Sequence, residues 1–160
     1  MKKILILCMV GILFLTACSF NTMNALYGDN KKIASTSNTY NLNSNEQEIN
    51  QQTFTGNIEF EGMETIWEYE AKEDAQLEIE YLLSLTQGTA KLVLISPDGT
   101  VTPIVENTNK SEVKELARSP LGIKKGNNRI KLVAKNKANI RFEVHIEAGE
   151  FFELGMGKMD

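Results

Sequence analysis

The sequence is poor in the residues that most enzymatic and metal sites require. Its 160 residues include two cysteines and one histidine, so zinc sites and cysteine–histidine chemistry lack their usual groups. No Gly-x-Ser-x-Gly elbow, phosphate-binding glycine loop or nucleotide fingerprint occurs. We therefore expect a protein without catalytic activity, metal or cofactor.

The chain also lacks an excess of positive charge. Lys and Arg number 17 against 21 Asp and Glu, which gives a formal net charge of −4. A nucleic-acid-binding protein normally presents a concentrated basic face, so nucleic acid is not an expected partner. Hydrophobic residues make up 42% and charged residues 24%, which are proportions typical of a globular protein.

Residues 1–17 have the features of a secretory signal peptide. Lys2 and Lys3 form a basic start, and the run 4–17 carries no charge. As a helix, that run is about 21 Å long, which is shorter than the hydrocarbon core of a bilayer at about 30 Å. The pattern therefore indicates a signal peptide rather than a membrane span. An uncleaved N-terminal anchor is the alternative.

A short motif ends this segment: Leu15-Thr16-Ala17-Cys18, followed by Ser19. It resembles the lipobox of bacterial lipoprotein precursors. In that family the cysteine receives a diacylglyceryl group, and the signal is cut just before it. The resemblance implies lipidation of Cys18 and a protein whose partner is the membrane, on the extracytoplasmic face of the cell membrane. Ordinary signal cleavage, with Cys18 as a free thiol, is the alternative.

Removal of the signal changes the charge and the cysteine content of the chain. Without Lys2 and Lys3, 15 basic side chains face 21 acidic ones, so the formal charge becomes −6. Cys8 leaves with the signal and Cys18 is acylated, so we expect no disulfide. Anionic lipid headgroups repel an acidic body, and we therefore expect the body to stand off the membrane.

Residues 18–50 predict a flexible tether. The stretch is rich in Asn, Ser and Thr, and its scattered apolar residues (Leu26, Ile33, Tyr40 and Leu42) follow neither the helical nor the strand period. Such a segment buries too little surface to offset the entropy lost on ordering. A flexible chain of this length, about 32 residues, has a root-mean-square reach of about 30 Å.

Residues 51–148 alternate between apolar and polar side chains, as half-buried strands do. Ser96-Pro97-Asp98-Gly99 has the residue types of a type I turn, which predicts a hairpin between 90–95 and 101–105. Pro103 then favours an edge position for the second strand. The other predicted strand segments are 53–60, 65–71, 77–85, 121–123, 129–133 and 140–146, the last two as a hairpin across 135–138.

These segments predict an all-β fold, an antiparallel β-sandwich of the jelly-roll kind with about eight short strands. At most one short helix is expected, at 110–117, where Asn109 and Glu112 have the spacing of a capping box and Pro120 follows. A local helix at 23–27, within the tether, is the alternative. The tail 149–160 contains Phe151 and Phe152, which cap the sandwich or form a partner site.

Few residues are candidates for a ligand site. Trp67 and Tyr69 could stack on a sugar, but their alternation with the acidic Glu68 and Glu70 favours a place in the core. His145 shares a polar strand face with neighbouring glutamates, which indicates a solvated surface residue. Calcium could bind in loops at three carboxylates, although no dense Asp/Asn loop supports such a site; these are Asp74, Asp98 and Glu106.

Two segments of the body carry a further resemblance. The strand and turn Leu92–Gly99 (LVLISPDG) and the run Leu121–Ile146 resemble small jelly-roll modules of secreted bacterial proteins, of the pre-peptidase C-terminal and carbohydrate-binding types. The chain is also similar to small lipoproteins of Gram-positive bacteria. The resemblance implies a non-catalytic binding or adhesion module at the cell envelope, with a protein or a glycan as partner. The alternatives are an accessory subunit of an envelope complex and a small hydrolase that uses two carboxylates.

Overall fold

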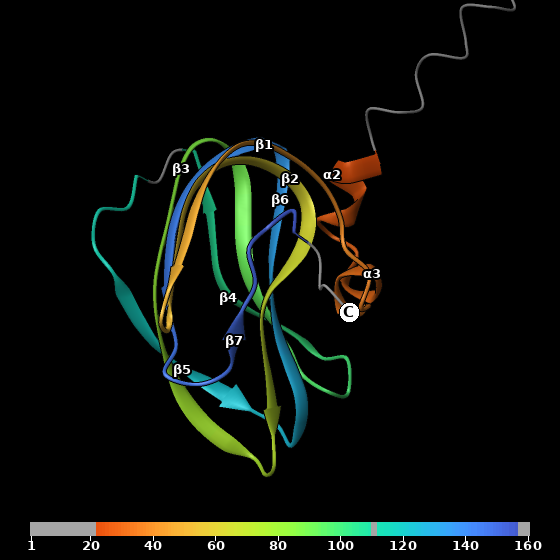
Figure 1. The fold of residues 1–160 in the computed structure, drawn as a ribbon. Helices are drawn as coiled ribbons and strands as arrows, with labels where there is room; N and C mark the ends of the chain where they lie inside the picture. Colours follow the sequence, from red (N-terminus) through yellow and green to blue (C-terminus); the bar gives the residue numbers. More distant parts are fainter. Residues whose placement is uncertain (1–21, 110–111, 157–160) are drawn as a thin grey trace, which may run out of the picture.

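The computed structural model describes residues 22–109 and 112–156 (Figure 1). Two short helices, α2 (Thr22–Leu26) and α3 (Asn30–Ala34), precede an antiparallel sheet. The strands are β1 (Thr39–Asn50), β2 (Thr53–Ala71), β3 (Ala75–Ile95), β4 (Val101–Thr108), β5 (Ala117–Ile123), β6 (Gly126–His145) and β7 (Glu150–Phe151). The expected all-β, sandwich-like architecture is confirmed.

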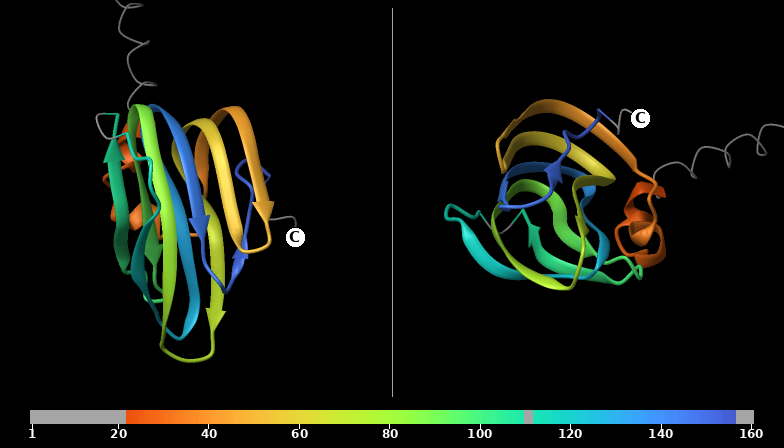
Figure 2. Two further views of the ribbon diagram at one scale, coloured as in Figure 1. Left: turned by 90° about the vertical axis from the view of Figure 1, so that its left-hand side faces the viewer. Right: turned by 60° about the horizontal axis from the view of Figure 1, so that its bottom comes forward.

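The sheet curls over itself to form two layers (Figure 2). Its strand order is β1-β2-β6-β3-β4, with β5 added to β3 and β7 added to β2. In the first layer, 53–60 of β2 pairs with 138–145 of β6, which pairs with the first half of β3. In the second layer, 62–71 of β2 pairs with 126–134 of β6, which pairs with 89–95 of β3. Each long strand therefore contributes to both layers.

The three central strands bend at one level, which we call the crease. Gly62 in β2 has φ 108°, Gly88 in β3 has φ 78°, and Asn136 and Lys137 in β6 have φ 62° and 46°. The pairing register shifts at the same places. At Gly88 a Cβ would lie 2.6 Å from the Cα of Ala138, so the close approach of β6 requires a glycine there.

Because the strands continue through the crease, several segments that were predicted as separate strands are parts of one strand. Segments 53–60 and 65–71 belong to one strand, β2, and 77–85 and 90–95 belong to one strand, β3. The hairpin predicted across 135–138 is wrong, because β6 continues through these residues and both of its halves pair with β2 and β3. Apolar alternation is the same on either side of a bend and a turn, so the pattern alone does not distinguish them.

The predicted turn at 96–99 is confirmed. It joins β3 to β4, with Ile95 paired to Val101, and the Gly99 N–H donates to the Ser96 carbonyl over 2.9 Å. Pro103 lies in β4, which ends the strand order of the sheet. A proline is tolerated there because one side of an edge strand has no neighbouring strand to accept from its backbone.

The helix predicted at 110–117 is wrong in its described part. Residues 112–116 are not helical, and β5 begins at Ala117. The Val113 N–H donates instead to Ser84 Oγ over 3.2 Å, which draws this segment onto β3. The two helices of the described chain lie elsewhere, in the segment where a tether was expected.

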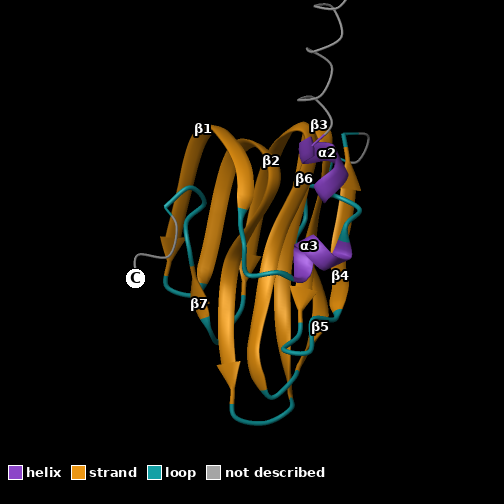
Figure 3. Cartoon of the chain, turned by 90° about the vertical axis from the view of Figure 1, so that its right-hand side faces the viewer, coloured by secondary structure: helices purple, strands orange, loops and turns teal. Residues whose placement is uncertain are grey.

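The predicted tether is wrong for its described residues, 22–50. This segment forms α2, α3 and β1, and β1 pairs with β2 along its length. Leu26, Tyr27 and Ile33 are buried against the outer surface of the second layer, where the two helices lie (Figure 3). Contacts with strands far along the chain offset the ordering entropy, and composition does not reveal such contacts. The signal peptide and Cys18 lie outside the described residues.

The main core lies between the layers. The Phe54 and Phe142 rings meet edge to face, with centroids 4.9 Å apart. Phe151 and Leu154 of the tail are buried in the same cluster, and the Gln47 side chain bonds both the N–H and the C=O of Leu154. The described part of the tail therefore caps the sandwich, while residues 157–160 lie outside the described residues.

Candidate binding site

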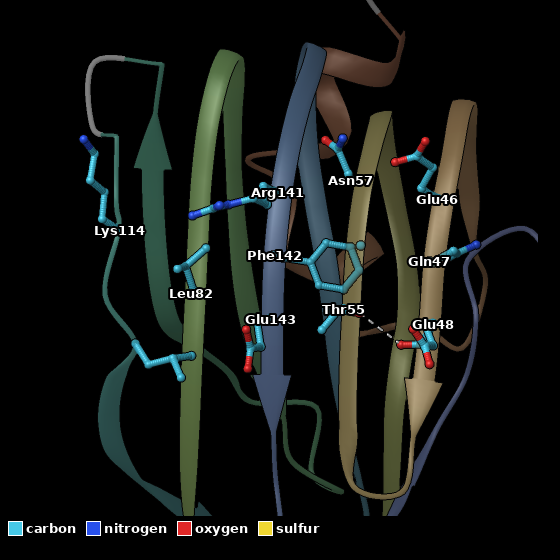
Figure 4. A pocket seen from close by; sticks show the side chains of 12 residues that line it. Glu46, Gln47, Glu48, Thr55, Asn57, Leu82, Lys114, Arg141, Phe142 and Glu143 are labelled. Atoms are coloured by element: carbon cyan, nitrogen blue, oxygen red, sulfur yellow. Dashed lines mark hydrogen bonds between the residues drawn. The ribbon is translucent and has the colours of Figure 1, made fainter.

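A shallow trough of about 750 Å³ crosses the outer surface of the first layer (Figure 4). Strands β1, β2, β6 and β3 form its floor, and the segment between β4 and β5 forms one wall. We call it the trough. Its lining residues are Glu46, Gln47, Glu48, Thr55, Gly56, Asn57, Leu82, Lys114, Leu116, Arg141, Phe142 and Glu143.

Strand periodicity places the polar residues of the trough on its outer face. Arg141 and Glu143 flank Phe142, whose ring packs in the core, so the two charged side chains point the other way. Asn57 lies directly opposite Arg141, and Thr55 lies opposite Glu143. The floor is therefore a row of hydrogen-bonding groups with fixed spacing.

Phe142 lies against a glycine of the neighbouring strand in the floor of the trough. Gly56 is its direct cross-strand partner, and a Cβ at that glycine would overlap the Phe142 ring. The ring therefore covers the glycine and fills the space that a side chain would otherwise occupy. This aromatic residue belongs to the core and offers no open face to a ligand.

Leu82 and Leu116 form a small apolar area at the wall of the trough, which we call the apolar step. Leu82 is buried, whereas Leu116 is 46% exposed. Leu116 and Met156 are the large apolar side chains that the described residues expose to solvent. A small apolar area bordered by charges is typical of the centre and rim of a protein interface.

The charges of the trough are mixed. Glu46, Glu48 and Glu143 bring three carboxylates, and Lys114 and Arg141 bring two cations. This site was not predicted from the sequence, because its β1 residues lie in the predicted tether. The alternation of Glu46 and Glu48 with Gln47 and Ile49 was the available signal.

Trp67 does not provide a sugar platform. Its side chain is fully buried, and its Nε1 donates to the Ala148 carbonyl over 2.8 Å. Tyr69 is half-buried, with its ring centroid 5.9 Å from that of Trp67. The stacking hypothesis is therefore wrong for Trp67, and the core assignment favoured by the alternation is confirmed.

His145 lies at the end of β6 among polar partners. Its Nδ1 is 3.0 Å from Thr53 Oγ1, and its Nε2 is 3.2 Å from a carboxylate oxygen of Glu147. It is partly exposed. These contacts agree with the expected position of a surface histidine.

The three carboxylates considered for calcium are engaged separately. Asp74 accepts from Lys124 Nζ over 3.0 Å and from the Lys125 N–H over 2.9 Å. Asp98 accepts from the Thr100 N–H. Glu106 accepts from the Tyr27 hydroxyl over 2.7 Å. In the described part of the chain, no group of three or more His, Cys, Asp or Glu side chains is arranged to hold a metal ion.

Residues 22–38, which we call the strap, are held to the second layer by a polar cluster that contains Arg129 and Lys131. Lys131 Nζ donates to the carbonyls of Ser35 and Ser37 over 2.9 and 2.7 Å. The Arg129 guanidinium donates to the carbonyls of Ala34 and Ser35 over 2.7 and 2.8 Å. These bonds satisfy the carbonyl of Ala34, the last residue of α3, and those of Ser35 and Ser37, which follow the helix.

The cluster includes a buried carboxylate. Glu64 accepts from the Gly155 N–H at 3.1 Å and is almost inaccessible to solvent. Burial raises its pKa to about 7, against the lowering effects of the Gly155 hydrogen bond and the Lys131 charge. Burial also lowers the pKa of Lys131 to about 8. This cluster was not predicted from the sequence, because Glu64 and Lys131 both lie within or beside alternating strand segments.

Tyr27 anchors the other end of the strap. The Nζ atoms of Lys91 and Lys135 each lie 4.5 Å from the centroid of its ring. Burial, together with the hydrogen bond to Glu106, raises the pKa of the Tyr27 hydroxyl far above its usual range. Two cation–π contacts and one charge-assisted hydrogen bond thus fix this side chain.

Comparison with known proteins returns neither a matching family model nor a matching curated protein. The function of the chain is therefore inferred from its own residues. Neither helix of the described residues has the length and apolar character that a membrane span requires.

Proposed function

We propose that this protein is a membrane-anchored lipoprotein on the extracytoplasmic face of the cell membrane. We propose further that its sandwich is a non-catalytic binding or adhesion module for a protein of the cell envelope. The motif Leu15–Cys18 supports the anchoring. The trough is the observation that supports binding.

A protein partner suits the trough better than a glycan. Sugar sites commonly use flat aromatic faces, and the aromatic residue that lines the trough, Phe142, has its ring in the core. The trough instead combines the exposed Leu116 with charges of both signs. An apolar centre with a polar rim is the arrangement of a protein interface.

Crosslinking from the trough tests this proposal. A photoreactive amino acid replaces Asn57, on the trough floor, in the full chain in native membranes. A matched chain carries it at Asp98, in the exposed turn between β3 and β4. We expect a discrete protein adduct from position 57 that is absent from position 98.

Two substitutions decide whether the adduct depends on the trough. Leu116→Asp removes the apolar step and is expected to abolish the adduct, whereas Lys72→Glu, at an exposed position outside the trough, leaves it unchanged. An adduct that survives Leu116→Asp contradicts the trough as the site. Retention of a purified glycan by the full chain, with no protein adduct, contradicts the protein partner.

A further inference from the structure

The strap shortens the connection between the proposed lipid and the folded body. Cys18 precedes Thr22, the first residue of α2, by four positions. Four residues of fully extended chain span at most about 14 Å. A body attached by so short a linker stays next to the bilayer, whereas the 30 Å tether expected from composition would let it move away.

The strap itself does not lengthen this linker, because it is fixed to the second layer. Leu26, Tyr27 and Ile33 are buried there. Near the start of α2, Asn24 Oδ1 accepts from the Asn136 N–H over 3.1 Å. The hydrogen bonds of Arg129 and Lys131 hold the end of α3, so the strap is attached along its length.

The strap face, which consists of α2, α3 and the adjoining outer surface of the second layer, carries net positive charge. Its outer lysines outnumber its outer carboxylates, and Asp29 and Glu106 already bond Lys32 and the Tyr27 hydroxyl. Beneath the strap, Arg129 and Lys131 are balanced by Glu64 and Glu68. The outer lysines are Lys31, Lys32 and Lys135, whereas Lys91 is buried with its Nζ over the Tyr27 ring.

The trough lies on the opposite side of the sandwich and has one more carboxylate than cations. The helices cover the second layer (Figures 1 and 3), whereas the residues of the trough floor belong to the first layer. Stacked sheets pack about 10 Å apart, and a helix adds a layer of similar thickness, so the two surfaces are separated by about 20 Å. An anionic bilayer therefore attracts the strap face more strongly than it attracts the trough.

We propose that the strap face lies against the anionic membrane surface and that the trough consequently faces away from the bilayer, toward envelope partners. This orientation rests on the proposed lipidation of Cys18. The linker holds the body near the membrane, and the charge difference selects the side that faces it. The net acidic charge of the body does not prevent this arrangement, because the charge is unevenly distributed.

A single introduced thiol measures the orientation. Cys8 is removed with the signal and Cys18 is acylated, so Asn30→Cys on α3, or Asn57→Cys in the trough, provides one free thiol for a nitroxide. Both positions are exposed. The lipidated full chain is placed in vesicles of phosphatidylcholine and phosphatidylglycerol that contain a nickel-chelating lipid. We expect the nickel at the membrane surface to increase the relaxation rate of the nitroxide several-fold more at position 30 than at position 57.

Equal enhancement at the two positions, or a larger effect at position 57, overturns the orientation. A second chain has about twelve Gly and Ser residues inserted between Asn21 and Thr22, which gives the whole linker a root-mean-square reach of about 22 Å. We expect the insertion to bring the two enhancements close together. An unchanged ratio overturns the role of the short linker.

Flotation of the same vesicles separates this inference from the proposed function. The wild-type chain is expected to float with the vesicles and Cys18→Ala is expected to remain behind. A wild-type chain that remains behind contradicts the lipidation, and the orientation with it. A chain that floats but relaxes equally at both positions contradicts the orientation alone.

Discussion

Lys131 and Glu64, on adjacent strands, hold the strap and the C-terminal tail to the same layer. Lys131 Nζ bonds the Ser35 and Ser37 carbonyls, and the Glu64 carboxylate accepts from the Gly155 N–H. The two side chains are 0% and 2% exposed. Burial moves the pKa of Glu64 up to about 7 and that of Lys131 down to about 8. Burial therefore disfavours the charged form of both groups, and Glu64 changes its protonation state near neutral pH.

The buried carboxylate makes stability depend on pH. The pKa of Glu64 is about 7 in the fold against a reference value of 4.5, so the folded state binds the proton more tightly. The contribution of Glu64 protonation to the free energy of unfolding is fully present below about pH 4.5 and is lost as the pH rises through about 7. This contribution changes by an amount on the order of 3 kcal/mol. Glu64→Gln keeps an oxygen that accepts from Gly155 and removes the charge. We expect this variant to lose that part of the pH dependence.

Urea unfolding at about pH 5 and about pH 7.5 measures the effect as a difference between variant and wild type. Glu48→Gln, at an exposed position in β1, is the matched control and should follow the wild type. If the difference in unfolding free energy between Glu64→Gln and the wild type is the same at both pH values, Glu64 does not titrate in this range.

Loss of the Lys131 ammonium should release the strap without unfolding the sandwich. Lys131→Met keeps the apolar stem but leaves the Ser35 and Ser37 carbonyls without their donor, which costs about 1–3 kcal/mol. Hydrogen exchange is expected to accelerate in peptides covering α2 and α3 while protection in β3 is retained. Lys137→Met, at an exposed position, is the control. Uniform acceleration across the chain would assign Lys131 to global stability instead.

The crease requires glycine at position 88 for two reasons, and only one of them holds at Gly99. Both residues have positive φ, 78° and 83°, but a Cβ at Gly99 meets nothing within 4 Å, whereas at Gly88 it meets the Ala138 backbone. We expect Gly99→Ala to lower the free energy of unfolding by about 1–2 kcal/mol. Gly88→Ala should lower it by about 3 kcal/mol or more, because steric overlap adds to the conformational cost. Equal losses in chemical denaturation would mean that β3 relaxes away from β6.

Trp67 is the single tryptophan, so its fluorescence reports on the core. Its full burial and its bond to Ala148 predict a blue-shifted emission in the native state that iodide does not quench. Unfolding should shift the emission to the red and make it quenchable. A native emission that iodide quenches readily, or that a glycan shifts, would restore the sugar-stacking hypothesis.

The sequence predicted those features that follow from local chemistry. The alternation at 77–85 places Leu83 and Leu85 in the core, and the residues of 96–99 form the turn that joins β3 to β4. The same alternation put Trp67 inside. Each of these predictions depends on side-chain period or turn preference over a few residues, which one strand or turn expresses by itself.

The errors arose where contacts between distant segments decide the structure. Residues 22–50 have the composition of a disordered segment, yet Ile33 of α3 is buried against the second layer and β1 pairs with β2. The helix expected at 110–117 gave way to a hydrogen bond between Val113 and Ser84. In both cases a tertiary contact outweighed the local propensity.

The sequence by itself determined that this chain is a β-protein with an apolar core, and it carries the motif that suggests a lipid at Cys18. The tertiary structure decided that three strands bend together at the crease, that the strap is packed on the second layer, and that β1 completes the trough. The physical reason is that strand pairing joins residues far apart in sequence, and the free energy of those contacts is set by the partners together.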